Sequence, residues 1–166
     1  ERYTLPHDLR LLKTQGVFLV ALVGDWYLVL DSLLPQQYVF DHWIADVTCL
    51  PYLKSAGATS VSDFPVFSMD LQRFCKYTNV AKDIDVAFIG NLRSSIHTRR
   101  ARYLRRLAAL SGDLSIFIGQ ELYGNAYVQT FNRAHMVFNL AIHGELNMRC
   151  FEALGCGALL LIEADN

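Results

Sequence analysis

The stretch Ile84-Asp85-Val86-Ala87-Phe88-Ile89-Gly90 decides the fold that we predict for this chain. Its apolar end and closing glycine are typical of the first strand of a parallel sheet, followed by a turn into a helix. The pattern then continues as helix 97–110, strand 114–118, helix 123–133, strand 136–140, helix 146–154 and strand 158–162. Because helices and strands alternate throughout, the sheet is expected to be parallel.

The same alternation precedes this stretch and forms a first block. It runs as helix 5–14, strand 17–23, helix 33–39, strand 45–50, helix 51–55 and strand 60–64. The continuous apolar run 17–23 predicts a strand that is buried on both faces. Residues 65–81 have no sustained period, so the break between the blocks lies there. We predict an α/β fold of two Rossmann-like parallel-sheet blocks, both incomplete, over 1–66 and 84–166, with 67–83 as a linker.

Composition excludes several classes of protein. Apolar residues make up 52% of the 166 residues, which indicates a folded core, and the net charge of -1 provides no overall field for nucleic acid. The longest apolar run is too short to cross a bilayer, and no secretory signal opens the sequence. We therefore expect no transmembrane segment. The scattered cysteines Cys49, Cys75, Cys150 and Cys156 favour buried, reduced thiols, and hence a cytoplasmic protein.

A possible phosphate site follows the strand at 84–90. In an open parallel sheet the ligand lies outside the carboxyl ends of the strands. Gly90, Asn91 and Arg93 provide a small turn, backbone N–H groups and a cation at that place. The turn lacks the G-x-G-x-x-G and P-loop patterns, so it does not indicate a nicotinamide enzyme or an ATPase of those types. The alternative is an ordinary strand-to-helix turn.

The predicted helix 97–110 is rich in arginine. It carries Arg99, Arg100, Arg102, Arg105 and Arg106. Their spacing spreads them around the helix, so several are expected to face solvent. Only the two in the first turn are near enough to the glycine turn to reach a phosphate.

The densest constellation runs from Asn139 to Gly157 and combines a strand exit, a polar loop and a helix. Its second part begins the string Glu145-Leu-Asn-Met-Arg-Cys-Phe-Glu-Ala-Leu-Gly-Cys-Gly-Ala-Leu-Leu-Leu161. It resembles the donor-site signature of GT-B glycosyltransferases, in the form of the spore-maturation, CgeB-like family of glycosyl transferase group 1. Segments 64–70, 85–90 and 127–139 are similar to that family's earlier blocks. The resemblance implies two Rossmann-like domains facing a cleft. Residues 1–66 would then be the C-terminal part of the acceptor-side domain, and 84–166 a truncated nucleotide-sugar-binding domain.

The resemblance also implies roles for individual residues. Glu152 would bind the ribose hydroxyls, since a carboxylate accepts two hydrogen bonds from a vicinal diol. Gly144, Glu145 and Asn147 would offer the loop and the helix start to the diphosphate or the sugar. Arg149 would neutralise phosphate charge, or pair with Glu145 four residues earlier.

The family's pattern is not matched throughout. Many relatives place seven residues between two glutamates, whereas six separate Glu145 from Glu152. His143 occupies the loop and either contacts a phosphate or a sugar hydroxyl, or faces solvent. Asp25, on the acceptor side, either touches an acceptor or caps the next turn.

The resemblance implies a glycosyltransferase that uses a nucleotide-sugar and an unknown acceptor, without a cofactor or a metal. The remaining parts of the same glycosyltransferase would complete the two domains. Cations and a helix dipole would stabilise the leaving diphosphate. The alternative function is a non-catalytic nucleotide- or protein-binding α/β module, because a fold alone does not establish activity.

Overall fold

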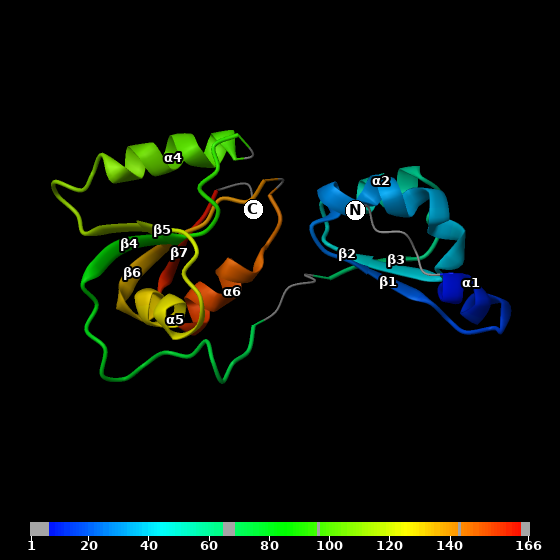
Figure 1. Ribbon diagram of the computed structural model, residues 1–166, viewed down its shortest axis with the longest axis horizontal. Coiled ribbons are helices and arrows are strands. Elements are labelled where there is room, and N and C mark those ends of the chain that lie inside the picture. Colours follow the sequence, from blue (N-terminus) through cyan, green and yellow to red (C-terminus); the bar gives the residue numbers. More distant parts are fainter. Residues whose placement is uncertain (1–6, 65–68, 96, 143, 164–166) are drawn as a thin grey trace. The chain divides into compact units, whose positions relative to one another are not determined.

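The computed structural model of the chain describes residues 7–64, 69–95, 97–142 and 144–163 (Figure 1). It is a mixed α/β structure with two parallel sheets, one of three strands and one of four. This confirms the predicted fold class. The chain divides into two compact units, Glu1–Phe67 and Ser68–Asn166, each of which holds one sheet.

The first unit is a small sheet with helices packed on its core face. Its elements are α1 (His7–Thr14), β1 (Val20–Val23), α2 (Trp26–Leu33), the 3-10 helix η1 (Leu34–Val39), β2 (His42–Ala45), α3 (Leu50–Ser55) and β3 (Val61–Asp63). The strands lie in the order β1-β2-β3. Val23 pairs with Ala45 and Ala45 pairs with Asp63, so the carboxyl ends of all three strands are level.

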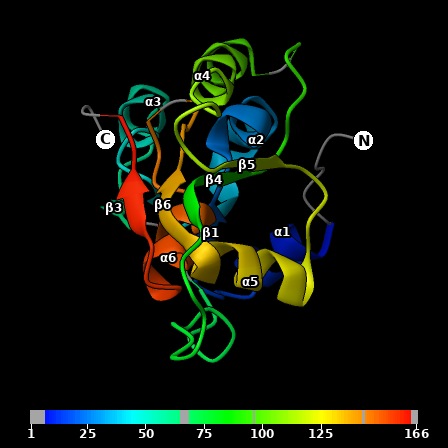
Figure 2. The ribbon, with the colours of Figure 1, turned by 90° about the vertical axis from the view of Figure 1, so that its left-hand side faces the viewer.

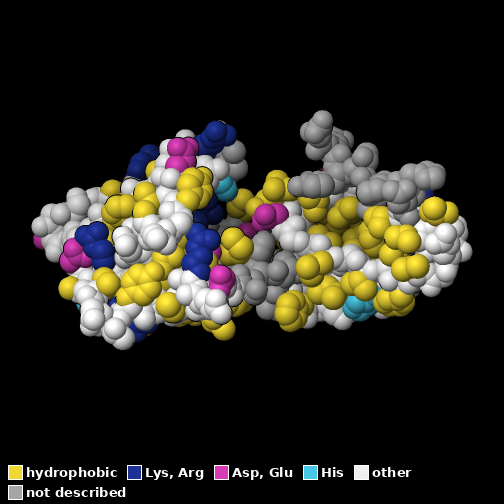
Figure 3. All heavy atoms as spheres, turned by 60° about the horizontal axis from the view of Figure 1, so that its bottom comes forward, with side chains coloured by type: hydrophobic (Ala, Val, Ile, Leu, Met, Phe, Trp, Pro, Cys, Tyr) yellow, Lys and Arg dark blue, Asp and Glu magenta, His cyan; other side chains and the backbone are white. Residues whose placement is uncertain are grey.

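The prediction that the first strand is buried on both faces is wrong. Ala21 and Val23 are buried, whereas Val20 and Leu22 are 45% and 64% exposed. Helices α2 and α3 pack against the face that Ala21 and Val23 share, and this core takes only alternate residues of the strand. Hydrophobic side chains are accordingly widespread on the surface of this unit in Figure 3.

Two helix and strand positions in this unit also differ from the prediction. Helix α2 was not expected, and the predicted helix 33–39 is its 3-10 continuation η1. Strand β2 ends at Ala45, earlier than predicted, because the Asp46 carboxylate accepts hydrogen bonds from the amide and the hydroxyl of Thr48 at 2.9 and 2.7 Å. This local turn directs the chain into α3.

The second unit is a four-stranded sheet with helices on both faces. Its elements are β4 (Ile84–Ile89), α4 (Thr98–Ala108), β5 (Ile116–Gly119), α5 (Gly124–Arg133), β6 (Ala134–Phe138), α6 (Met148–Gly155) and β7 (Leu159–Leu161). The strands lie in the order β5-β4-β6-β7, all parallel. Helix α4 covers one face, and α5 and α6 cover the other (Figures 1 and 2). The predicted order of elements is confirmed, with β6 two residues earlier than expected.

Residues 69–83, within the predicted linker, pack on the second unit. Phe74 belongs to the core that α5, α6 and the sheet form. The buried Asn132 accepts a hydrogen bond from the Tyr77 amide at 2.6 Å and donates one to the Cys75 carbonyl oxygen at 3.1 Å. The main chain also lies close to Gly155, where an added Cβ would stand 2.5 Å from the Phe74 carbonyl oxygen. The assignment of the units as acceptor-side and nucleotide-sugar domains stays a prediction.

Candidate functional site

The candidate site lies at the carboxyl ends of β4 and β6. These strands are neighbours in the sheet, so the loops that follow them leave the same edge. Gly90 follows β4, and its amide donates to the Gly119 carbonyl oxygen at the end of β5 (3.0 Å). The loop after β6 leads into α6. This edge therefore gathers the predicted residues from 90 to 93 and from 144 to 152.

Arg149 links α6 to the ends of both strands. Its Nε donates to the Ile89 carbonyl oxygen at 2.8 Å, and its Nη1 donates to Asn139 Oδ1 at 2.6 Å. The guanidinium carbon lies 4.8 Å from the centre of the Phe88 ring. Burial lowers the pKa of Arg149, although the nearby Tyr127 hydroxyl opposes this shift. Arg149 thus places a half-buried positive charge at the ends of both strands.

Glu152 lies one turn further along α6 and is only 7% exposed. The Tyr127 hydroxyl on α5 donates to its Oε2 atom at 2.5 Å. Burial and the neighbouring Glu152 carboxylate raise the pKa of Tyr127, so the phenol keeps its proton. The carboxylate is therefore an internal group with a fixed neighbour, rather than a surface glutamate of the helix.

Asn139 organises the loop between β6 and α6. It is fully buried and accepts hydrogen bonds from Arg149 Nη1 and from Asn147 Nδ2, the latter at 3.2 Å. Its own amide donates to Cys150 Sγ at 3.2 Å. Asn147 is the N-terminal cap residue of α6, which begins at Met148. One buried amide thereby holds the start of α6 against the end of β6.

Glu145 is buried at 5% exposure, and its Oε1 accepts a hydrogen bond from the Ile142 amide at 3.3 Å. It precedes α6, so the i,i+4 helical geometry considered for a pair with Arg149 does not exist there. Gly144 has a left-handed backbone with φ +77°, which favours glycine. His143 lies outside the described residues.

The turn after β4 is held by its own side chains. Asn91 Oδ1 accepts a hydrogen bond from the Arg93 amide at 2.9 Å, and both side chains are exposed. Arg100 is buried, and its Nη2 donates to the Leu140 carbonyl oxygen at 2.8 Å, which joins α4 to the loop after β6. Arg99 forms an ion pair with Glu163. Arg93 therefore remains a better candidate for binding a phosphate than Arg99 or Arg100 in the first turn of α4.

Sequence analysis did not identify His97 as a site residue. It is the N-terminal cap residue of α4, and its amide donates to the Arg93 carbonyl oxygen at 3.0 Å. Burial, together with the nearby charges of Arg100 and Arg149, lowers the pKa of His97. Among the described residues, its buried Nδ1 has no hydrogen-bond partner. The sequence does contain a signal for His97, because this histidine lies between the glycine turn and the arginine-rich helix.

Asp25 in the first unit is exposed and takes a left-handed backbone at φ 44°. It precedes α2, but its side chain makes no capping hydrogen bond; the Tyr27 hydroxyl lies 3.5 Å from its Oδ1. The capping alternative for Asp25 is thus not supported by the side chain. Its role toward an acceptor stays a prediction.

The sequence contains one D-x-D string, Asp83-Ile84-Asp85, at the opposite end of β4. The Asp83 carboxylate accepts two hydrogen bonds from Arg133 at 2.8 and 2.7 Å, and Asp85 Oδ2 accepts one from the Ser115 amide at 2.8 Å. These carboxylates therefore stabilise the amino edge of the sheet. Within the described ranges, no group of three or more His, Cys, Asp or Glu is arranged to hold a metal ion.

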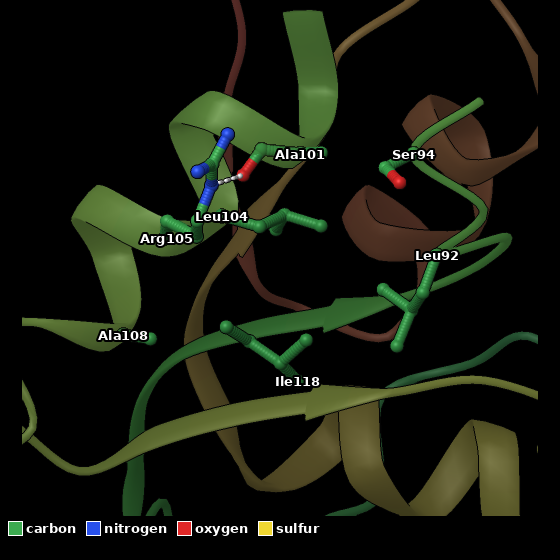
Figure 4. A pocket seen from close by; sticks show the side chains of 7 residues that line it. All are labelled: Leu92, Ser94, Ala101, Leu104, Arg105, Ala108 and Ile118. Carbon is green, nitrogen blue, oxygen red and sulfur yellow. Dashed lines mark hydrogen bonds between the residues drawn. The ribbon is translucent and has the colours of Figure 1, made fainter. Parts of the chain in front are cut away.

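A shallow groove of about 520 Å³ lies beside the turn after β4 (Figure 4). It is lined by Leu92, Ser94, Ala101, Leu104, Arg105, Ala108 and Ile118. The Arg105 side chain bends back along α4, and its Nε donates to the Ala101 carbonyl oxygen at 3.3 Å. The groove is mainly apolar and contains none of the predicted site residues.

Comparison with known proteins identifies a family for the second unit. The second unit is a Rossmann-like α/β domain whose polar groups converge at the carboxyl edge of its sheet. A family model described as glycosyl transferase-like matches residues 72–166, and the chain belongs to this family. No curated protein matches the chain. No helix in the described part of the chain is long and apolar enough to span a membrane.

Proposed function

We propose that the chain moves a sugar from a nucleotide-sugar donor to an acceptor, as the inner part of a GT-B glycosyltransferase of the spore-maturation, CgeB-like form. Membership of the glycosyl transferase-like family supports glycosyl transfer in general. The resemblance of residues 145–161 to a donor-site signature supports the finer assignment. The observation that carries the proposal is the convergence of the half-buried Arg149 and the buried Glu152 on α6, whose start lies at the edge where β4 and β6 end.

In this proposal the diphosphate lies against the turn after β4 and the start of α6. Gly90, Asn91 and Arg93 face it from one loop, and Gly144, Glu145 and Asn147 from the other. His143, which lies outside the described residues, is kept as a donor-binding residue on the sequence alone. The first-turn N–H groups of α6 and the positive end of its dipole favour an anion. Arg149 contributes a full positive charge from below.

The ribose lies further along α6, where Glu152 accepts hydrogen bonds from its hydroxyls. A carboxylate makes charge-assisted hydrogen bonds, which are stronger than those between neutral groups. A buried carboxylate is costly unless it is paired. Tyr127 supplies one partner, and a ribose diol supplies the others.

During transfer, the bond between the anomeric carbon and the diphosphate oxygen breaks while the acceptor hydroxyl oxygen bonds to that carbon and releases its proton to the solvent. Negative charge grows on the leaving diphosphate. Arg93, Arg149 and the α6 dipole stabilise this charge, so the proposal requires no metal and no cofactor. Asp25 is assigned to the acceptor side. Three of the four free cysteines, Cys49, Cys150 and Cys156, are buried, and they support a cytoplasmic location.

The test is turnover of the donor. The chain is incubated with uridine- and guanosine-diphosphate hexoses, and release of the nucleoside diphosphate is measured against a protein-free blank. The proposal is supported if the protein releases nucleoside diphosphate from a donor and Glu152→Gln lowers this release at least tenfold. Tight binding of a nucleoside diphosphate with no release from any donor would instead favour a non-catalytic nucleotide-binding module.

A further inference from the structure

We infer that the Tyr127 hydroxyl holds the Glu152 carboxylate in the orientation in which it recognises a ribose diol, which makes Tyr127 the positioning residue for ribose selectivity. The inference rests on the proposed function and deepens it. It concerns a residue on α5 that reaches the site only through another side chain.

The contact itself is short and specific. Tyr127 and Glu152 are 25 residues apart and belong to different helices on one face of the sheet. The hydroxyl donates to Oε2 at 2.5 Å, which is at the short end for an O–H···O⁻ hydrogen bond. Such a bond selects one rotamer of a side chain that otherwise has several.

The direction of the hydrogen bond is fixed by burial. The pKa of Tyr127 is raised by its burial and by the Glu152 carboxylate, so the hydroxyl remains the donor. Glu152 therefore acts as the acceptor in this pair.

The position of the hydroxyl is fixed by the core. The Tyr127 ring centre lies 4.5 Å from that of Phe131 and 6.0 Å from that of Phe74, in a nearly perpendicular arrangement with the latter. Aromatic contacts of this kind restrict the ring to one place. The fixed ring therefore fixes the position of the hydroxyl next to Glu152.

One carboxylate oxygen remains for the ligand. Across the part of the chain that the structure describes, no protein group donates a hydrogen bond to Glu152 Oε1. An ionised carboxylate oxygen accepts two hydrogen bonds, so Oε1, with the second lone pair of Oε2, can serve both hydroxyls of a vicinal diol. Without Tyr127 the carboxylate can turn away from this arrangement.

The experiment compares ribose with dideoxyribose. Binding of uridine and guanosine diphosphates and of their 2′,3′-dideoxy forms is measured by calorimetry for the wild type, Tyr127→Phe and the control Tyr123→Phe, whose side chain is 78% exposed. The wild type is expected to prefer the ribose form by about tenfold or more. Tyr127→Phe should reduce that preference to less than about threefold while leaving the affinity for the dideoxy form unchanged.

Each outcome decides the question. An unchanged ratio in folded Tyr127→Phe would overturn the positioning role while leaving the ribose contact of Glu152 intact. A wild type that binds both forms equally would overturn the ribose contact in the proposed function, and the positioning role with it. If Tyr127→Phe does not fold, Tyr127→Met, which fills similar space without a hydroxyl, replaces it under the same criteria.

Discussion

The Nη2 atom of Arg149 occupies the space beside Gly90 where any other residue would carry its Cβ. An added Cβ at Gly90 would stand 2.3 Å from this nitrogen and 3.1 Å from the Phe88 ring. Arg149 cannot easily move away, because Ile89 and Asn139 hold its other nitrogens. The glycine after β4 is therefore required by the packing of the Arg149 guanidinium group against it.

We predict that Gly90→Ala destabilises the protein by about 1 to 3 kcal/mol, the usual cost of overpacking. The matched control is Gly112→Ala, where an added Cβ meets nothing within 4 Å. Urea unfolding of both variants checks the difference. Equal stability of the two variants would show that Arg149 is free to move.

We expect the hydrogen bonds of Asn132 to stabilise the attachment of residues 75–77 to α5. Asn132→Ala removes the partner of the Tyr77 amide and of the Cys75 carbonyl oxygen, and should cost about 1 to 3 kcal/mol. The exposed Asn125 on the same helix provides the control, Asn125→Ala. Thermal unfolding measures both. If Asn132→Ala is as stable as the control, these hydrogen bonds contribute nothing to the attachment of the segment.

His97 gives a pH-dependent prediction. Its pKa is lowered by burial and by Arg100 and Arg149, so the free protein holds it neutral at pH 7. A diphosphate bound at this edge favours the charged form and should raise the pKa of His97. Binding then takes up a proton and strengthens as the pH falls below 7. NMR titration of the imidazole with and without uridine diphosphate measures this change. If the bound nucleotide leaves the pKa of His97 unchanged, the phosphates of the nucleotide bind elsewhere.

Glu152→Gln tests the ribose contact directly. Glutamine keeps the size and one acceptor for the Tyr127 hydroxyl but removes the charge. The loss of charge-assisted hydrogen bonds should weaken nucleoside diphosphate binding about ten- to a hundredfold, with little change in thermal stability. A variant that loses stability but binds nucleotide normally would make the carboxylate a structural group.

Sequence patterns predicted the second unit better than the first. The apolar run 84–89 is long and is followed by glycine, so its strand was clear. Helix α2, Trp-Tyr-Leu-Val-Leu-Asp-Ser-Leu, is apolar at six of its eight residues. The face that it buries, with Trp26 and Leu30 four residues apart, therefore does not stand out in the sequence. The exposed face of β1 could not be predicted either, because a run of apolar residues does not show whether helices cover one face of the sheet or both.

Within the site, the sequence indicated residues but not their partners. Arg149 and Glu152 were both identified, yet the contacts of Arg149 with Ile89 and Asn139 span 60 and 10 residues, and depend on which strands are neighbours. The Tyr127 contact likewise depends on α5 and α6 sharing one face. Such pairs follow from topology, which a single sequence does not encode locally.

The central claim is that a nucleoside diphosphate binds at the carboxyl edge of the second sheet, and amide chemical-shift mapping tests it most directly. Uridine, guanosine and adenosine diphosphates are titrated into the labelled chain. The account predicts that at least one of them binds with submillimolar affinity and shifts the amides of Gly90, Asn91, Gly144 and Arg149, while those of Asp83 and Asp85 at the opposite edge stay in place. Shifts confined to other surfaces, or no binding by any of the three, would contradict it.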